Sequence, residues 1–428
     1  MSTILIGVFV GALLLGVPIA FVMGIASLAV LLIDGSFPLV VVPQRMFNGL
    51  DSFPLMAVPF FILAADLMTA GRITQALLSF SRALVGHIRG GMGHVNVLVS
   101  VFFAGISGSA LADAAGPSAI AMRMMNKAGY PMSYSAALSA ATATIGPIIP
   151  PSIIMVIYGI SESRVSIAQM FLAGILPGCL MGLALALANL VISRRNNYGG
   201  GQAFAGFRTI AKTALKAIPA ILVPLIILGG ILGGVFTPTE AAAVAVVYSL
   251  LVGFAQRTLT IGILPQILLR SALLSSAVLM IVSTASIFAW LLTVSQLPQD
   301  FGAAIAALKF GELGTLLLLA LLILVFGLFI DTIPAVIVLT PILAPIAFNA
   351  GVDPLHFAMV LILNLTVGMV TPPVGPVLFV ISTVGRIRIE VLTRAILPLL
   401  AVQLFVLLLI ILFPQITLAI PRLFGYGG

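Results

Sequence analysis

Long apolar segments follow one another along almost the whole of this chain of 428 residues. A membrane-spanning α-helix needs about 20 predominantly apolar residues. Only 7% of the residues are charged, against roughly a quarter in soluble domains. The sequence therefore predicts an all-α, multi-pass membrane protein surrounded by a lipid bilayer. The uninterrupted apolar segments run approximately over residues 3–33, 53–70, 132–160, 168–194, 211–234, 239–256, 261–294, 355–383 and 391–414.

The charges of the chain are arranged as in a membrane protein, and they do not indicate a nucleic-acid partner. The net charge is +8, but the Lys and Arg residues are scattered near the ends of the apolar segments. Cytoplasmic loops of membrane proteins carry such an excess of basic residues. The stretch from Arg194 to Lys216 contains five basic residues and no acid, so we expect a cytoplasmic loop there. Segment 3–33 forms either one tilted span or two short ones, which leaves the side of the N terminus open.

Two further apolar segments, 93–127 and 314–349, are interrupted halfway by glycine-rich or polar residues. Each half is too short to span a bilayer. Each segment is therefore expected to form a helical hairpin that enters the membrane and returns. Before the first hairpin, the stretch 72–92 has arginines at near-helical spacing among apolar residues and predicts an interfacial helix.

Two apolar segments contain related proline-rich breaks, ATATIGPIIPPS at residues 141–152 and LTVGMVTPPVG at 365–375. Proline lacks a backbone N–H and clashes with the carbonyl group four residues earlier, so 132–160 and 355–383 should be broken helices. Thr144 recurs as Thr366, which is 222 positions later (366 minus 144). Self-similarity at one offset indicates an internal repeat. The same offset relates Gly129 to Gly351, Gly146 to Gly368, Pro150 to Pro372, Pro151 to Pro373, Arg164 to Arg386 and Ile167 to Ile389.

The two repeats should be inverted relative to each other. Five steps through full spans lead from the first broken helix to the second, and an odd number inverts the direction, provided that 261–294 is one span. Inverted repeats with discontinuous helices are typical of secondary transporters. The predicted parts are N-terminal scaffold spans with the interfacial helix (1–92), the first repeat (93–190), the central basic loop with scaffold spans (191–313), and the second repeat with the C-terminal span (314–428).

The prolines leave backbone carbonyl groups without their helical partners. Freed carbonyl oxygens are hard ligands that suit an alkali cation, and the hydroxyl groups of Thr144, Thr366 and Thr371 can add to them. The alternative is a proline kink that only shapes the helix. Two copies at matched positions, each facing a polar hairpin tip, favour a binding site. The freed carbonyls are those of Gly146, Pro147, Gly368 and Met369.

A carboxylate substrate would fit between two such cation sites, because half-helix N-termini carry partial positive charge. The candidate substrate contacts are Thr144, Ser152 and Thr366. Asp113 and Asp331 are ionisable residues within membrane segments, where such residues are functional candidates. Each either takes part in coupling, as a proton carrier or a ligand, or caps the second helix of its hairpin.

The paired T-[IV]-G-x-x-x-P-P breaks, GISGSALADAAGPS at 105–118 and LPG at 176–178 resemble the large membrane subunit of tripartite ATP-independent periplasmic (TRAP) transporters. The resemblance extends over essentially the whole chain. It implies an elevator-type bundle in a bacterial inner membrane that carries organic acids, such as sialic acid or C4-dicarboxylates, inward with sodium. No cofactor is implied beyond these coupling ions. A small membrane subunit and a soluble periplasmic binding protein would be the partners.

The resemblance also implies two sodium sites that share their backbone plan. Gly146 and Gly368 belong to them and are also residues whose carbonyls the prolines free. Because the offset turns Ile149 into Thr371, one site offers a hydroxyl where the other offers only backbone. The first site would use Ser107, Ser109, Gly146, Ile149 and Pro151, and the second Gly327, Gly368, Thr371 and Pro373.

Three other functions remain as alternatives. Stand-alone dicarboxylate/sodium symporters share the plan, but they usually carry Ser-Asn-Thr at their hairpin tips, where this chain has Ser-Gly-Ser and Phe-Ile-Asp-Thr. A passive permease subunit of an ATP-driven importer would need an ATPase partner, since the chain has no G-x-x-x-x-G-K-[ST] phosphate loop. A membrane-embedded enzyme would need clustered ionisable residues, and Asp113 and Asp331 are too few and too far apart in sequence. We therefore expect a transporter and not an enzyme.

Overall fold

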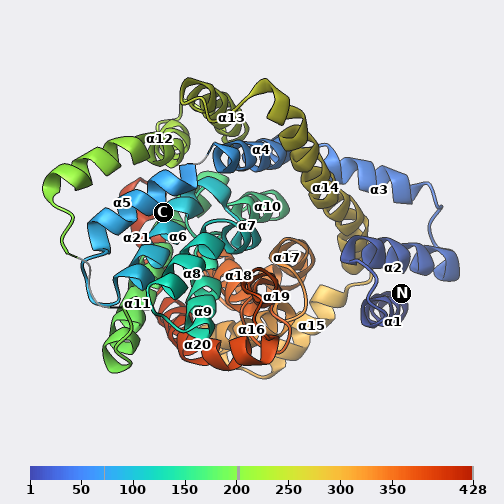
Figure 1. The fold of residues 1–428 in the computed structure, drawn as a ribbon. Helices are drawn as coiled ribbons and strands as arrows, with labels where there is room; N and C mark the ends of the chain where they lie inside the picture. Colours follow the sequence, from blue (N-terminus) through green and yellow to red (C-terminus); the bar gives the residue numbers. More distant parts are fainter. Residues whose placement is uncertain (72, 200–202, 427–428) are drawn as a thin grey trace.

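The computed structural model describes residues 1–71, 73–199 and 203–426, and all regular elements in these ranges are helices (Figure 1). Seven of the described helices are long and apolar enough to cross a membrane. This confirms the predicted all-α, multi-pass membrane protein. The seven are Phe53–Ala70, Ile167–Arg195, Phe207–Leu232, Pro238–Ala255, Ile261–Val294, Thr332–Asn349 and Ile389–Leu412.

The helices of the two repeats pack together as one bundle. The first repeat contains α6 (Gly91–Ser107), α7 (Ala110–Ala115), α8 (Pro117–Lys127), α9 (Met132–Ala143), α10 (Ile153–Ser161) and α11 (Ile167–Arg195). The second contains α16 (Gly311–Gly327), α17 (Thr332–Asn349), α18 (Pro354–Gly368), α19 (Pro376–Gly385), α20 (Ile389–Leu412) and α21 (Gln415–Leu423). The repeats contact each other through α9 with α20 and α10 with α17, so they form a single core.

The remaining helices form an arm, called the scaffold below, that curves around one side of this bundle (Figure 1). Its main helix, residues 264–294, packs against neighbours from both the scaffold and the bundle. The scaffold helices are α1 (Ser2–Leu14), α2 (Ile19–Asp34), α3 (Val41–Leu50), η1 (Phe53–Met56), α4 (Ala57–Ala70), α5 (Ile73–Val85), α12 (Phe207–Leu232), α13 (Pro238–Ala255), η2 (Ile261–Ile263), α14 (Leu264–Val294) and α15 (Leu297–Ala307).

Helix boundaries repeat at the offset of 222 positions that the sequence indicates. α9 and α18 begin at Met132 and Pro354, and α11 and α20 begin at Ile167 and Ile389. The hairpins end in register as well, since the last residues of α8 and α17 are 127 and 349. The glycines at 129 and 351 both have a left-handed backbone, with φ of 88° and 98°, which residues with a Cβ atom rarely adopt. The internal repeat is therefore present in the fold.

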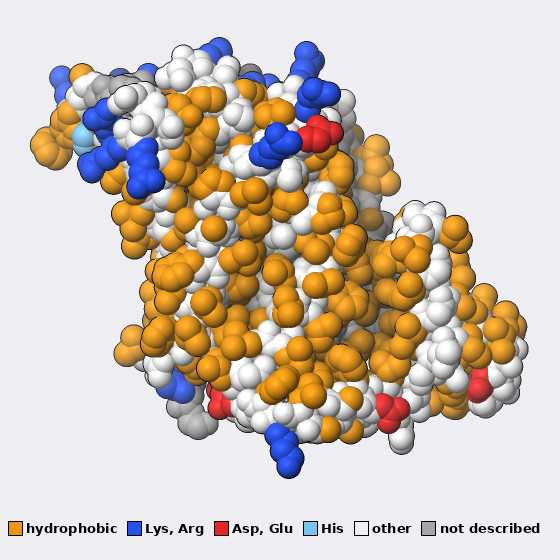
Figure 2. Space-filling view, turned by 90° about the horizontal axis from the view of Figure 1, so that it is seen from below, with side chains coloured by type: hydrophobic (Ala, Val, Ile, Leu, Met, Phe, Trp, Pro, Cys, Tyr) orange, Lys and Arg blue, Asp and Glu red, His pale blue; other side chains and the backbone are white. Residues whose placement is uncertain are grey.

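The charged side chains distinguish the two ends of the bundle. Figure 2 shows an apolar belt between an upper rim, where most of the visible Lys and Arg side chains gather, and a lower rim with most of the visible acidic side chains. Because α14 is a single helix, the number of crossings between the broken helices stays odd. Ser2 donates a hydrogen bond to the carbonyl of Ser295, just beyond the end of α14, at 3.3 Å. With the basic face taken as cytoplasmic, the N terminus lies at the outer face.

Several boundaries differ from those expected from hydropathy. Segment 3–33 forms two short helices, α1 and α2, which is one of the two alternatives left open by the sequence, because Gly16 with φ of 77° and Pro18 interrupt it. The expected loop from Arg194 to Lys216 is wrong in extent, since α11 continues to Arg195 and α12 begins at Phe207. Arg194 and Arg195 lie in the last turn of α11, where basic side chains complement the helix dipole.

The interfacial stretch 72–92 also divides differently, because α5 ends at Val85 and α6 already begins at Gly91. Its first residue, Arg72, lies outside the described residues. Three short helices, α3, α15 and α21, are additional elements that the sequence analysis did not predict.

Candidate functional site

The tip of the first hairpin lies directly against the first break, which separates α9 from α10. A Cβ atom added to Gly146 would lie 3.0 Å from the carbonyl oxygen of Ser109. One added to Gly108 would lie 2.7 Å from the carbonyl oxygen of Pro151. Only glycine lets two backbones approach so closely. Ser107 is next to them, since its hydroxyl accepts a hydrogen bond from the N–H of Ser109 at 3.4 Å.

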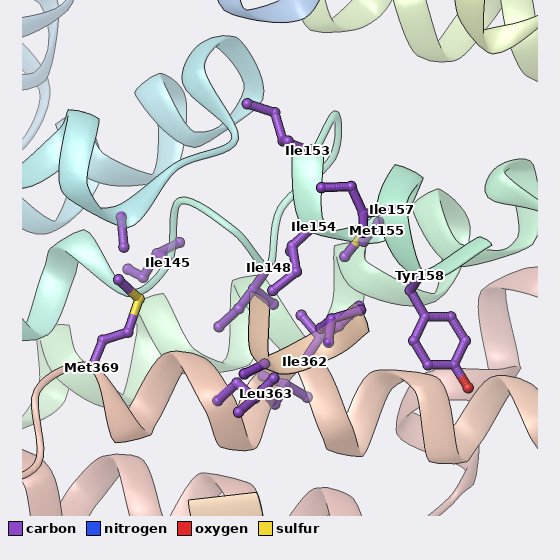
Figure 3. Close-up of a cluster of buried hydrophobic side chains, with 14 of the residues drawn as sticks. Ile145, Ile148, Ile153, Ile154, Met155, Ile157, Tyr158, Ile362, Leu363 and Met369 are labelled. Carbon is purple, nitrogen blue, oxygen red and sulfur yellow. The ribbon is translucent and has the colours of Figure 1, made fainter. Parts of the chain in front are cut away.

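Apolar side chains bury this break. Figure 3 shows Ile148 and Ile154 from the break region next to Ile362 and Leu363 of α18. Every residue from 141 to 158 is buried except Ile149, which is partly buried. Its side chain occupies the space beside a glycine of α11, at position 178. The first break is therefore part of the core. Four of the five residues predicted for the first sodium site lie where the hairpin tip contacts this break: Ser107, Ser109, Gly146 and Pro151.

The second break repeats this contact with a different degree of burial. A Cβ atom added to Gly368 would lie 2.8 Å from the backbone carbonyl carbon of Gly327 at the tip of the second hairpin. The N–H of Gly375 also donates to the carbonyl of Leu328 at 3.3 Å. Pro373 is exposed at this break. The structure thus brings Gly327 and Gly368 together, and the break around them is partly open.

The carbonyl groups freed by the prolines are only partly unpaired. The hydroxyl of Ser152 donates to the carbonyl of Pro147 at 2.6 Å. The N–H of Thr371 donates to the carbonyl of Gly368 at 3.0 Å. Among the described residues, none donates to the carbonyl of Gly146. A carbonyl oxygen has two lone pairs, so the paired groups keep one for a cation and Gly146 keeps both.

Both hairpin tips and both breaks line one small cavity of about 40 Å³. A cavity of this size holds a few water molecules. Pockets for small organic ligands usually measure about 300–1,000 Å³, so the site is closed to an organic acid in this conformation. The lining includes Gly108, Ser109 and Leu111 of the first hairpin, Pro147 and Ile154 of the first broken helix, Asp331 and Ile333 of the second hairpin, and Met369 of the second broken helix.

The returning helices of both hairpins start at this cavity and are capped at equivalent positions. Ser109 accepts a hydrogen bond from the N–H of Ala112 at the start of α7, at 3.4 Å. Asp331, 222 positions later, accepts one from the N–H of Thr332 at the start of α17, at 2.7 Å. Asp331 therefore caps its helix, and a part for it in coupling stays a prediction. Its carboxylate occupies the place where an external anion would meet this N-terminus.

Asp113 is fully buried and is not a helix cap, because Ser109 has that role in α7. Its Oδ1 accepts a hydrogen bond from the hydroxyl of Ser118 at 3.0 Å. This bond links α7 to α8 across the interruption at Gly116. No described residue pairs with Oδ2. A buried carboxylate is costly unless it is neutralised or paired, so Asp113 needs a proton or a cation.

Further polar groups surround this carboxylate inside the first repeat. Ser100 lies 3.4 Å from Ser118, oxygen to oxygen. Asn96 of α6 donates to the hydroxyl of Ser139 of α9 at 2.8 Å, and this hydroxyl donates to the carbonyl of Ser118 at 3.2 Å. The sequence analysis missed this network, because single Ser and Asn residues in apolar helices do not show which of them face one another.

The three candidate substrate contacts, Thr144, Ser152 and Thr366, do not line the central cavity. Each is fully buried and donates its hydroxyl to a backbone carbonyl three to five residues earlier. Gln403 of α20 also donates to the hydroxyl oxygen of Thr144, at 2.8 Å, and to the carbonyl of Ala141, at 2.9 Å. A substrate role of these residues stays a prediction without geometric support in this conformation. Gln403 was missed, although an amide within apolar segment 391–414 was a usable signal.

Comparison with known proteins agrees with this architecture. Residues 6–416 match the family described as tripartite ATP-independent periplasmic transporter, DctM component. The chain is 41% identical to the sialic acid TRAP transporter large permease protein SiaM of Vibrio cholerae, over 98% of both chains. It is 36% identical to the C4-dicarboxylate TRAP transporter large permease protein DctM of Pseudomonas aeruginosa, over 89% of both chains.

Two further proteins extend the comparison. The isethionate TRAP transporter permease protein DctMQ of Oleidesulfovibrio alaskensis is 40% identical over 99% of this chain and 66% of its own length. The solved structure of the YdaH transporter of Alcanivorax borkumensis shares the fold, with a TM-score of 0.62, 18% identity and coverage of 95% and 97% of the two chains. The chain belongs to the DctM-component family of tripartite ATP-independent periplasmic transporters, as the resemblance of its break and hairpin motifs implied.

Proposed function

We propose that this chain imports an organic acid, such as sialic acid or a C4-dicarboxylate, together with sodium ions. A periplasmic binding protein would deliver the substrate, and a small membrane subunit would complete the transporter. The relatives named above include permeases for sialic acid and C4-dicarboxylates. A relative named DctMQ, of which this chain covers 66%, is consistent with a second membrane component beside the large one.

The observation that carries the proposal is the convergence of both hairpin tips and both breaks on one cavity. In this arrangement, an ion bound at either break would lie near the same cavity and could change its shape. Movement of a hairpin tip by a few tenths of an ångström would change both the ion contacts and the cavity. Binding energy from an ion at a break is thereby available to organise the substrate site.

The carboxylate of Asp331 gives a physical reason for coupling to cations. It lines the cavity and already occupies the N-terminus of α17. Like charges brought together at low dielectric repel strongly. An organic acid therefore enters next to Asp331 favourably only when positive charge comes with it. Sodium ions bound at the two breaks would supply that charge.

The proposed ion sites are those that the resemblance implies. The first uses Ser107, Ser109, Gly146, Ile149 and Pro151, and the second Gly327, Gly368, Thr371 and Pro373. Support for the first comes from the unpaired carbonyl of Gly146 beside the backbone of Ser109. Support for the second comes from the close contact of Gly327 with Gly368.

An elevator-type movement of the bundle against the scaffold would open the site alternately to the two faces. A cavity of about 40 Å³ has to widen before it takes an organic acid. The division into a bundle that contains the site and a scaffold that curves around it suits such a movement (Figure 1).

Uptake into proteoliposomes tests the proposal. The chain would be reconstituted with its small membrane subunit and binding protein, and uptake of labelled sialic acid and succinate measured with an inward sodium gradient. Parallel vesicles would carry a potassium gradient or a pH gradient alone. Uptake driven only by sodium is the expected result. Uptake without the binding protein would instead indicate a stand-alone symporter, and uptake that needs ATP would indicate an ATP-driven importer.

Proton coupling is the second candidate, and the buried carboxylate of Asp113 favours it. Its unpaired Oδ2 accepts a proton without needing the several oxygen ligands that a metal ion needs. In the same vesicles, equal uptake driven by a pH gradient alone would move the coupling from the breaks to Asp113 and Asp331.

A further inference from the structure

Three cavities follow one another from the central site to the outer face of the bundle. The central cavity measures about 40 Å³. The next lies between α10, α17 and the scaffold helices α3 and α14, and measures about 330 Å³. The third lies among α14, α15, α16 and α17, and measures about 600 Å³. The second and third share Pro341 of α17, so they are adjacent.

One row of residues on α17, each four positions after the one before, winds around the helix and lines all three cavities; this row is called the face of α17 below. Residues four apart lie above one another on a helix, and Ile333, Ile337, Pro341, Pro345 and Asn349 follow that spacing. Ile333 lines the central cavity, Ile337 and Pro341 the second, and Pro345 and Asn349 the third. Their exposure is lowest at Ile337, which is 6% exposed, and rises outward through the half-buried Pro341 to the exposed Pro345 and Asn349, while Ile333 beside the central cavity is half-buried. A route that widens outward explains this gradient.

The opposite wall of the route changes from the bundle to the scaffold. α10 contributes Ile154 to the central cavity and Ile157 to the second one. Ile157 and Ile337, which are 2% and 6% exposed, line the second cavity about one helical turn beyond the residues of α10 and α17 that line the central one. In the second cavity, Ser286 of α14 and Asn48 of α3 add polar groups from the scaffold.

One cationic side chain lines the mouth of the route. Among the described residues that line the third cavity, Lys309 alone is charged, and it is exposed. The other polar groups that line this cavity are neutral, while two exposed acids, Asp300 and Glu312, follow lining residues directly in the sequence. A cation at the entrance of a cavity with low-dielectric walls concentrates anions there.

We propose that this face of α17 is the outward access route for the organic acid. Lys309 is its entrance cation, and Ile157 with Ile337 is the constriction that closes it here. The substrate class rests on the proposed function, whereas the route itself does not. Because the scaffold supplies one wall, movement of the bundle against it would remove the route at the outer face.

Thiol labelling tests the route without any transport. In a Cys179→Ser background, which has no other cysteine, single substitutions Asn349→Cys, Pro345→Cys and Ile337→Cys would follow the face. Val336→Cys and Leu339→Cys are matched controls on other faces of the same helix, 0% and 2% exposed. Variants would be compared only when their melting temperatures match that of the background protein.

A membrane-impermeant thiol reagent added at the outer face should react fastest at position 349, more slowly at 345, and measurably at 337. The two controls should stay unreactive. The route is excluded if position 337 reacts no faster than position 336, or if it reacts only from the cytoplasmic face. The labelling rates do not depend on sodium-driven uptake. A result that contradicts the proposed function would therefore not contradict the proposed route, and the reverse also holds.

The entrance cation is tested with anionic and cationic methanethiosulfonates at position 349, each rate normalised to that of a free thiol. Lys309→Gln should lower the preference for the anionic reagent about threefold, since a unit charge several ångströms away in screened water shifts energies by a fraction of a kcal/mol. Arg422→Gln removes a cation that lines a different outer cavity, and it should leave the preference for the anionic reagent unchanged. An equal effect of the two substitutions would mean that Lys309 has no special position.

Discussion

At the first break all residues from 141 to 158 are buried apart from Ile149, whereas at the second break Thr371 is half-buried and Pro373 exposed. Both breaks contact a hairpin tip through a glycine, and both contain a cis Pro-Pro peptide bond. The backbone plan is thus shared while the surroundings differ.

The helix that follows each break explains the difference. In α11, a Cβ atom added to Gly174 would lie 2.3 Å from the carbonyl oxygen of Ile148, and one added to Gly178 would collide with Ile149. At the equivalent positions of α20, 222 residues later, stand Ile396 and Leu400. Glycines let the first break pack closely against α11, whereas α20 has larger side chains at the equivalent positions. Because the prolines are the same in both breaks, we attribute the difference in burial to the neighbouring helix.

The polar network is a second asymmetry between the repeats. Asp113 corresponds to Ala335, and Ser118 to Thr340. The counterparts of Asn96, Ser100 and Ser139 are Leu318, Leu322 and Leu361. The first hairpin thus contains a buried carboxylate that the second lacks, while the second presents its carboxylate, Asp331, to the cavity. The two repeats thus share the backbone geometry of hairpin and break, but their membrane-embedded carboxylates stand at different positions.

The largest effect is expected from a methyl group at either break glycine. Gly368→Ala and Gly146→Ala should each reduce sodium-driven uptake more than tenfold, because the new Cβ atom would press on the hairpin backbone at 2.8 Å and 3.0 Å. A tenfold loss corresponds to about 1.4 kcal/mol of binding free energy. Gly229→Ala in α12, which has open space around it, is the control and should transport normally. Normal uptake by both Gly368→Ala and Gly146→Ala would contradict the proposed ion sites at the two breaks.

Gly174→Ala should destabilise the protein by about 1–3 kcal/mol, the usual cost of overpacking a core. The first break would have to move away from α11, so the difference in burial between the two breaks would shrink. Thermal unfolding in detergent measures the effect, with Gly229→Ala again as control. An unchanged melting temperature would show that α11 does not hold the first break.

Gln403→Leu should cost about 0.5–1.5 kcal/mol in the free energy of unfolding, the net value of a hydrogen bond. The substitution removes the amide that links α20 to Thr144 and Ala141. At the equivalent position of α11, Met181→Leu should cost less, because it changes shape without removing a hydrogen bond. Equal losses for the two variants would contradict a specific link to the first break.

Asp113→Asn should have the smallest effect. It keeps an acceptor for the hydroxyl of Ser118 and removes only the charge. Sodium-driven uptake should stay within about twofold of the wild-type rate, on the scale of about 0.4 kcal/mol set by a factor of two. Loss of uptake by a variant that folds normally would assign coupling to Asp113.

Much of the fold was predictable because its signals are local. Prolines at 150 and 372 marked both breaks, and the starts of α9 and α18 follow the repeat offset. Contacts between distant segments carried no such signal. The pairing of Gly108 with Pro151, the network around Asp113 and the link from Gln403 depend on which helix faces meet. In helices that are apolar on all sides, hydropathy does not distinguish those faces. For the same reason the sequence suggested Thr144 as a substrate contact, although its neighbours already pair with it.

The sodium dependence of the initial uptake rate, measured in proteoliposomes that contain the complete transporter, tests the central claim most directly. Two sodium sites at the two breaks predict a sigmoidal dependence in the wild-type protein. Thr371→Val, which removes a hydroxyl at the second break only, should shift the curve to higher sodium concentrations. A hyperbolic curve that Thr371→Val leaves unchanged, or a rate independent of sodium, would contradict ion binding at the two breaks.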